Sequence, residues 1–153
     1  MSDLGSITPK TVMARLVRSI NALQDRELSR LGIDLTAQQV AIVTFVETEG
    51  AKSIGEIAAR IGVDQSVATR LVDRLEDKRI LVRTRHPGDG RSVQVSNTRE
   101  GSRAAAVSIP AIDRLKRRVF AGVPEGDIEV FWRVLAMIEA NVTAASSDVG
   151  AAS

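Results

Sequence analysis

The sequence predicts a mainly helical protein with one small β-hairpin. Apolar residues recur at intervals of three and four along most of the 153 residues, as they do on the buried face of a helix. Only one stretch, residues 92–96, alternates polar and apolar residues with a period of two. It follows a turn rich in glycine and proline, His86-Pro-Gly-Asp-Gly-Arg91. The run from Ile80 to Arg85 before this turn is therefore the expected partner strand.

The composition narrows the class of protein. Hydrophobic residues make up 44% of the chain, enough for a core, and no apolar run approaches the roughly 18 residues that span a bilayer. No export signal is evident, and there are no cysteines, which excludes disulfides, Cys-based zinc sites and thiol redox switches. We expect a cytoplasmic protein that neither enters a membrane nor binds a metal.

Capping signals mark three helices in the first sixty residues. A residue that starts helices is followed, at helix length, by a glycine that ends them. The pairs are Thr8-Pro9 with Gly32, Thr36 with Gly50, and Ser53 with Gly62. Ser53 and Glu56 also have the spacing of a capping box, which predicts that the third helix is short and begins at this point.

The fourth predicted helix begins after Asp64 and has two unlike faces. Val67, Leu71 and Leu75 form its buried stripe. The opposite face carries hydroxyl groups, carboxylates and arginines: Ser66, Thr69, Arg70, Asp73, Arg74 and Asp77. This helix leads directly into the basic hairpin. A helix that can lie in a groove, beside a ribbon with arginine at its base and tip, suits a DNA duplex better than a small substrate.

Two helices are expected after the hairpin. The first begins after Thr98, runs to about Ala121 and contains Pro110, which predicts a kink or a local break because an interior proline costs about 3 kcal/mol. The second starts at Val123-Pro124 and has one apolar face: Ile128, Phe131, Trp132, Leu135, Ile138 and Val142. Residues 1–7 and 146–153 are small and polar, which is typical of flexible ends.

The net charge of +2 is unevenly distributed. Residues 60–99 hold nine basic and five acidic residues, whereas the rest of the chain holds twelve basic and fourteen acidic residues. A basic middle segment is typical of a surface that faces phosphates. A solvated charged surface would have the same composition, so both interpretations stay open on charge alone.

Taken in order, these elements predict a winged helix-turn-helix, in which the third and fourth helices form the helix-turn-helix and the hairpin is the wing. Over residues 8–143 the chain resembles the MarR (multiple antibiotic resistance regulator) family of transcription factors. Residues 67–78 are similar to the recognition helix of the family. The wing pattern is carried by Asp89-Gly-Arg91, Val93-Gln-Val95, Thr98 and Gly101.

Two positions depart from the family pattern. The family usually has glycine where Arg79 stands, and leucine where Asn97 stands. Glycine after a helix can adopt the left-handed conformation without steric cost. We therefore expect Arg79 either to be strained or to shift the end of the recognition helix.

The resemblance implies a homodimer that binds double-stranded DNA at a pseudo-palindromic operator. Residues 36–97 would form the winged helix-turn-helix domain, and residues 8–35 and 98–145 a helical dimerisation region. The apolar faces of residues 12–31 and 128–142 are consistent with a homodimer, because a single protomer has little core against which these helices could pack. The resemblance also implies a small aromatic or anionic effector between these regions, with repression that the effector relieves; no cofactor is expected.

The expected DNA contacts divide between the helix and the wing. A recognition helix reads bases from its N-terminal half, where Gln can pair with adenine and Arg with guanine. The base-reading candidates are Gln65, Ser66, Thr69 and Arg70, with Arg74 one turn further on and directed at the backbone. Arg85, His86 and Arg91 are the wing candidates for the minor groove. Asp89 is expected to hold the shape of the wing through an ion pair with an arginine.

Other interpretations of single residues remain open. Ser53 and Thr36 stand at helix N-termini, where they could help to bind a phosphate or could only cap their helices. The alternative function is a protein-interaction module whose basic hairpin binds an acidic partner; the hydroxyl, amide and arginine groups of the exposed helix face favour base edges instead. No enzyme is expected, because no catalytic constellation or phosphate-binding loop accompanies the single histidine.

Overall fold

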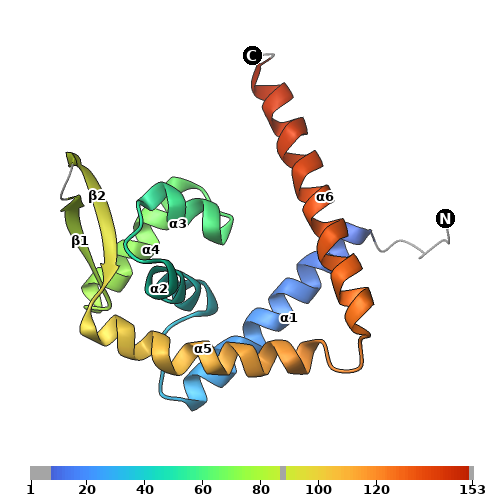
Figure 1. The fold of residues 1–153 in the computed structure, drawn as a ribbon, viewed down its shortest axis with the longest axis horizontal. Helices are drawn as coiled ribbons and strands as arrows, with labels where there is room; N and C mark the ends of the chain where they lie inside the picture. The colour runs from blue at the N-terminus through green and yellow to red at the C-terminus, as the bar shows by residue number, and fades with distance from the viewer. Residues whose placement is uncertain (1–7, 87–88, 152–153) are drawn as a thin grey trace. The chain divides into compact units, whose positions relative to one another are not determined.

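The computed structural model describes residues 8–86 and 89–151, with side chains for all of these except 86–92 and 146–151. The elements are α1 (Pro9–Arg30), α2 (Ala37–Glu49), α3 (Ile54–Ile61), α4 (Gln65–Asp77), β1 (Leu81–His86), β2 (Asp89–Asn97), α5 (Arg99–Val119) and α6 (Glu125–Ala151) (Figure 1). The mainly helical fold class with a β-hairpin wing is thus confirmed. Residues up to Leu115 and residues from Lys116 onward form two separate compact units.

The N-terminal caps predicted from the sequence are present at three helices. The Thr8 hydroxyl accepts a hydrogen bond from the Thr11 N–H at 3.3 Å. Thr36 and Ser53 each form a complete capping box. Asp64 occupies the N-cap position of α4, but its side chain makes no capping hydrogen bond. Local sequence therefore places the starts of these helices, although the start of α4 is held differently.

The core of the first unit is formed by α2, which is buried on most sides, by one face each of α3, α4 and α5, by Leu28 of α1 and by the base of the hairpin. Its fully buried large side chains are Leu28, Val40, Ile42, Val43, Ile57, Val72, Leu75 and Val95. Burial of such side chains stabilises the fold by about 1.5–3 kcal/mol each. Because α4 packs through its apolar face, its polar face is left outward.

Helix α5 continues without a break through Pro110, so of the kink or local break predicted there the break is wrong, and the kink stays a prediction. Pro110 is exposed, and so is Ala106, whose carbonyl loses its helical partner to the proline. Water can hydrate that carbonyl from the same side. On its other side α5 buries small residues and one leucine: Gly101, Ala104, Ala105, Ser108, Ala111 and Leu115. This packing holds the helix together on both sides of Pro110.

The wing is a two-stranded antiparallel hairpin joined to the helix-turn-helix at its base. Its register runs from Leu81 opposite Asn97 to Arg85 opposite Val93, with an irregularity between Arg85 and His86. Lys52, just before α3, exchanges two backbone hydrogen bonds with Val95, at 3.0 and 2.7 Å. These bonds fix the base of the hairpin next to the start of α3.

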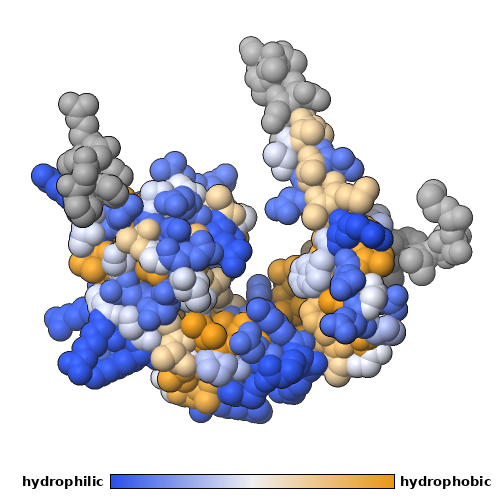
Figure 2. Space-filling view, in the orientation of Figure 1, coloured by the Kyte–Doolittle hydropathy of each residue, from blue (hydrophilic) through white to orange (hydrophobic). Residues whose placement is uncertain are grey.

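The second unit is mostly α6, and most of its predicted apolar face is exposed. Of that face, Ile138 is 42% exposed, Trp132 is 55% exposed and Val142 is 61% exposed. Hydrophobic residues accordingly appear in tan on the surface of α6 in Figure 2. Within this unit, Phe120, Phe131 and Trp132 form an aromatic cluster whose ring centroids lie 5.3–6.2 Å apart. None of the helices in the described ranges is long and apolar enough to cross a bilayer.

Candidate nucleic-acid interface

The N-terminal half of α4 gathers the four base-reading candidates. Gln65, Ser66 and Arg70 are exposed, and Thr69 is half-buried beside them. They lie in the first two turns, where residues four apart share a face. Arg74 is exposed one turn further on. The left-handed Gly62, with φ of +67°, ends α3 just before this surface and so sets the angle at which α4 leaves the turn.

The Thr69 hydroxyl is already used within the helix. It donates to the Gln65 carbonyl at 2.8 Å. Its proton is therefore engaged within the helix. A threonine with its proton so engaged can still contact a thymine methyl, but it does not donate to a phosphate.

Ser53 is fully engaged by its capping box. Its backbone N–H and its hydroxyl both donate to Oε2 of Glu56 at 2.8 Å. The hydroxyl also accepts from the Glu56 N–H at 3.3 Å. These hydrogen bonds from the Ser53 backbone and side chain lower the pKa of Glu56 below its usual range. A carboxylate at this helix start repels phosphate, so the geometry favours the capping role that the sequence left open.

On the wing, Arg85 is the candidate whose side chain is described, and it is exposed. It lies on the same face of the ribbon as Arg83, two residues nearer the tip. The backbones of His86, Asp89 and Arg91 belong to the strands, but their side chains lie outside the described residues. Their roles in DNA contact and in holding the wing stay predictions.

The end of α4 shows how the chain accommodates Arg79 in place of glycine. The Arg79 N–H donates to the Glu76 carbonyl at 2.7 Å, and the Ile80 N–H donates to the Leu75 carbonyl at 2.8 Å. This is the Schellman motif, and it places Arg79 at φ of +58°. The expected strain is therefore present and the end of the helix has not shifted. Thr98 then donates to the Arg79 carbonyl at 2.7 Å.

The start of α5 packs backbone to backbone against this turn. A Cβ atom on Gly101 would lie 2.3 Å from the Ile80 carbonyl oxygen. The glycine of the wing pattern is therefore required by this close approach. Asn97 is the second position that departs from the family pattern. Its side-chain amide donates to the Val43 carbonyl at 3.0 Å and to Glu47 at 2.7 Å. Its own Oδ1 is buried without a partner among the described residues.

An ion-pair cluster that the sequence patterns do not predict joins α4 to the wing. Arg83, in β1, contacts Asp73 at 2.8 Å and also contacts Glu76. In the sequence, Arg83 is one of the nine basic residues of the segment 60–99 and no local spacing links it to these carboxylates. The three-residue spacing of Asp73 and Glu76 shows that they share a helix face, but their partner lies beyond the turn that ends the helix.

Two open hollows of about 440 and 420 Å³ are both lined by the loop between α1 and α2. The first is lined by α1, this loop, α2 and Lys78, and the second by the loop, Lys78, Ile80 and α5. Lys78, just after α4, donates to the carboxylate of Asp34 at 2.8 Å and to its carbonyl at 2.6 Å. The Lys78 ammonium lowers the pKa of Asp34. The end of α4 is thus tied to the loop that both hollows share.

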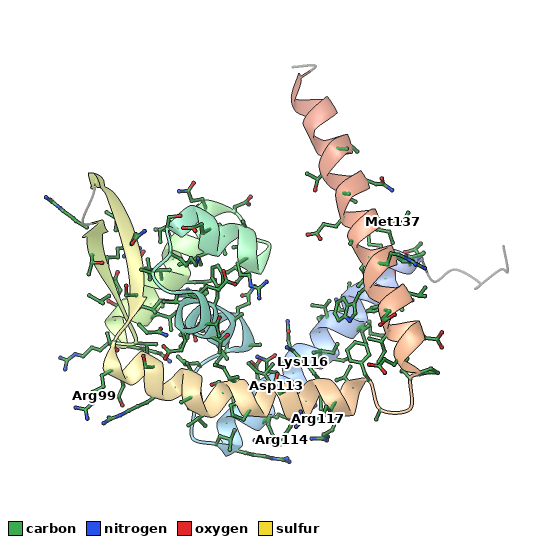
Figure 3. The ribbon with its side chains drawn as sticks, viewed as in Figure 1. Arg99, Asp113, Arg114, Lys116, Arg117 and Met137 are labelled. Atoms are coloured by element: carbon green, nitrogen blue, oxygen red, sulfur yellow. The ribbon has the colours of Figure 1, made fainter. Side chains whose placement is uncertain are left out.

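The surface of α5 carries further basic residues beyond the segment singled out in the sequence. Arg99, Arg114 and Arg117 project from this helix into solvent (Figure 3). The last turn of α5 holds Lys116, Arg117 and Arg118. Cations at this position stabilise the negative end of the helix dipole, by about 0.3–1 kcal/mol each. Their placement is explained by α5 itself and needs no ligand.

Known proteins are similar to this chain at two levels: in the sequence of its winged-helix segment and in the fold of nearly the whole chain. The model of the MarR family matches residues 33–92. The transcriptional repressor MdtR of Bacillus subtilis is 34% identical over 67 residues, which are 44% of this chain and 43% of MdtR. The chain thus aligns with less than half the length of this curated relative.

Two solved structures extend the similarity to nearly the whole chain. The MepR–DNA complex of Staphylococcus aureus has a TM-score of 0.80 at 15% identity and covers 90% of this chain and 99% of MepR. Bordetella bronchiseptica BpsR, whose DNA binding is regulated by 6-hydroxynicotinic acid, has a TM-score of 0.76 at 19% identity, with 88% and 94% covered. The winged-helix segment thus matches the MarR family model, and the fold of nearly the whole chain is similar to that of these solved proteins.

Proposed function

We propose that this protein is a dimeric, sequence-specific DNA-binding transcriptional regulator of the cytoplasm. Its output would be repression that a small ligand relieves. The observation that carries the proposal is the exposed N-terminal face of α4, where an amide, hydroxyl groups and a guanidinium stand together on a rigid helix. Such groups match the donor and acceptor pattern of base edges in a major groove. They do not favour the alternative of a protein-interaction module.

Within this function the residues divide between reading and anchoring. Gln65, Ser66, Thr69 and Arg70 would read bases, and each good bidentate pair would discriminate by about 1–3 kcal/mol. Arg74 would contact the backbone. On the wing, Arg85, His86 and Arg91 would bind phosphates and the minor groove, and Asp89 would hold the wing. Ser53 would support DNA binding indirectly, by capping the start of α3.

The exposed apolar surface of two long helices supports a homodimer. On α1 the side chains of Val12, Met13, Leu16, Val17 and Leu23 are each at least 38% exposed. On α6 the corresponding set is Val130, Phe131, Trp132, Val134, Met137, Ile138 and Val142. Apolar patches of this extent are typical of protein–protein interfaces. We assign residues 8–35 and 98–145 to dimerisation and residues 36–97 to DNA binding.

The hollows beside the loop between α1 and α2 support regulation by a ligand. They offer apolar walls such as Ile33 and Leu35, together with the ammonium group of Lys78, which an acid would share with its present partner Asp34. A small aromatic acid matches this combination. BpsR, which has the same fold, responds to 6-hydroxynicotinic acid, a ligand of this chemistry. Because Lys78 follows α4 directly, a ligand that contacts it could alter the position of the recognition helix.

The test is selection of bound DNA from a random pool, with and without small aromatic acids. The expected product is a pseudo-palindrome with half-sites about one helical turn apart. The Arg70→Ala variant should relax the base preference, whereas Arg91→Ala should weaken binding to all sequences and lower the salt slope by about one. A single asymmetric half-site, or no enrichment at all, would contradict the proposal.

A further inference from the structure

Arg83 is bonded to the recognition helix through both its backbone and its side chain. Its N–H donates to Oε1 of Glu76 at 2.9 Å. Its Nη1 donates to Oδ1 of Asp73 at 2.8 Å and to Oε2 of Glu76. Asp73 and Glu76 lie three residues apart on α4 and therefore share the face that meets the wing. One strand residue thus holds two helix residues.

The charges of this cluster are satisfied within the protein. The Arg83 guanidinium faces two carboxylates, and its side chain is only 28% exposed. It is therefore engaged before any phosphate approaches. Without it, two negative charges would remain on the helix that must lie against DNA. Arg83 reduces this repulsion, but it does not offer its own charge to the duplex.

The position of Arg83 along the ribbon gives the cluster a geometric role. At the base, the wing is held by the buried Leu81 and Val95 and by the Lys52 bridge. Arg83 stands opposite Val95, and Arg85 stands two residues nearer the tip. Among the described residues, no hydrogen bond or ion pair joins the body of the protein to the wing beyond Arg83. Arg83 is the last attachment before the part of the wing that would reach DNA.

We propose that Arg83 is a positioning residue that locks the wing to the recognition helix, so that both can engage adjacent grooves of one DNA site. This inference rests on the proposed DNA-binding function. It does not place Arg83 in contact with DNA. The wing would keep a fixed distance and angle from α4, and the preference for the base pairs beneath the wing would depend on that geometry.

The sharpest test is a variant for which charge and geometry predict opposite results. Glu76→Gln removes one negative charge from the DNA-facing helix, so electrostatics alone predicts tighter binding. Loss of the lock predicts weaker binding, by about tenfold, on the operator selected by the wild-type protein. Asp77→Asn is the matched control: it makes the same change of charge on the same helix, at an exposed residue that forms no ion pair within the described chain. It should bind as tightly as wild type or more tightly.

The measurement is affinity for two duplexes that share the half-site centres but differ in the base pairs beneath the wing. Glu76→Gln should lower the ratio of these affinities toward one and leave the preference at the half-site centres intact. A variant that merely folds less well would lose affinity equally on both duplexes, so its ratio would not change. Melting curves at the same protein concentration check that each variant is folded.

Two substitutions of Arg83 complete the test. Arg83→Lys keeps the charge but not the forked guanidinium that reaches two carboxylates. Its ratio of affinities for the two duplexes should therefore lie between that of wild type and one. Arg83→Gln should bring the ratio of affinities close to one. The salt dependence of its DNA binding should stay that of wild type, because no phosphate contact is removed. A slope lower by about one, or tighter binding by Glu76→Gln, would overturn the inference. If the wild-type protein selected no DNA, the proposed function itself would fail.

Discussion

The two helices of the helix-turn-helix, α3 and α4, both end in a left-handed residue, but they differ in the residues that occupy their N-terminal and C-terminal capping positions. Helix α3 begins with a full capping box at Ser53 and ends on Gly62 in the left-handed conformation. Helix α4 begins at Asp64 without a side-chain cap and ends on Arg79, which is forced into the same left-handed region. The Schellman hydrogen bonds are nevertheless present at both C-terminal ends.

This difference shows which helix is built for stability. Every capping position of α3 holds a residue that favours the observed backbone. At α4 the side chain of Asp64 makes no capping hydrogen bond, and the C-terminal turn is strained by about 1–3 kcal/mol. The end of α4 must therefore be held by its surroundings: the hydrogen bond from Thr98, the ion pair of Lys78 with Asp34, and the close packing of Gly101.

The largest effect is expected from breaking the packing that holds the end of α4. Gly101→Ala would place a Cβ atom 2.3 Å from the Ile80 carbonyl, so the backbone must move. We expect a loss of about 3 kcal/mol in the free energy of unfolding, measured by urea denaturation at fixed protein concentration. Gly55→Ala, near the start of α3, is the control, because the nearest atom to its new Cβ is 4.0 Å away. Equal losses for both variants would contradict this account.

The two C-terminal caps give a pair of changes with opposite signs. Gly62→Ala meets no atom within 4 Å, so its cost of about 1–2 kcal/mol is that of a left-handed backbone alone. Arg79→Gly should relieve the same strain and stabilise the protein by about 1 kcal/mol. Arg79→Ala keeps the strain and removes the charge, so it should melt close to wild type. If Arg79→Ala were as stabilising as Arg79→Gly, charge and not backbone strain would be the cause.

These positions also show what sequence can and cannot predict. The caps at Thr8, Thr36, Ser53 and Gly62 depend on residues within a few positions, so local patterns found them. The Arg83 cluster was missed because the turn after α4 separates its partners and no local spacing reveals it. The unbroken α5 was missed for a related reason: the side of the helix on which Pro110 falls is decided by packing against the core.

Removal of the N-cap residue should destabilise α3 more than α4, but the difference in stability should be smaller than that expected at the C-terminal ends. Ser53→Ala removes a hydroxyl that completes a capping box and should cost about 1 kcal/mol. Asp64→Ala removes no capping hydrogen bond and should cost less than half as much, the remainder being attraction to the helix dipole. Thermal melts of the two variants at neutral pH compare them directly. A larger loss for Asp64→Ala would show that α4 depends on its N-cap after all.

The smallest effect should appear in acid. Hydrogen bonds from the Ser53 backbone and hydroxyl lower the pKa of Glu56 below its usual 4.5 in the folded protein. A carboxylate whose folded pKa is depressed stabilises the fold above its unfolded pKa, and this contribution is lost as the pH falls through the folded value. Wild type should therefore be more stable than Glu56→Gln at pH 6, and the difference should shrink as the pH is lowered from about 4.5 to 3. Denaturation of both proteins across this range measures it. A difference that is the same at pH 6 and pH 3 would mean that Glu56 caps α3 through its shape and not through its charge.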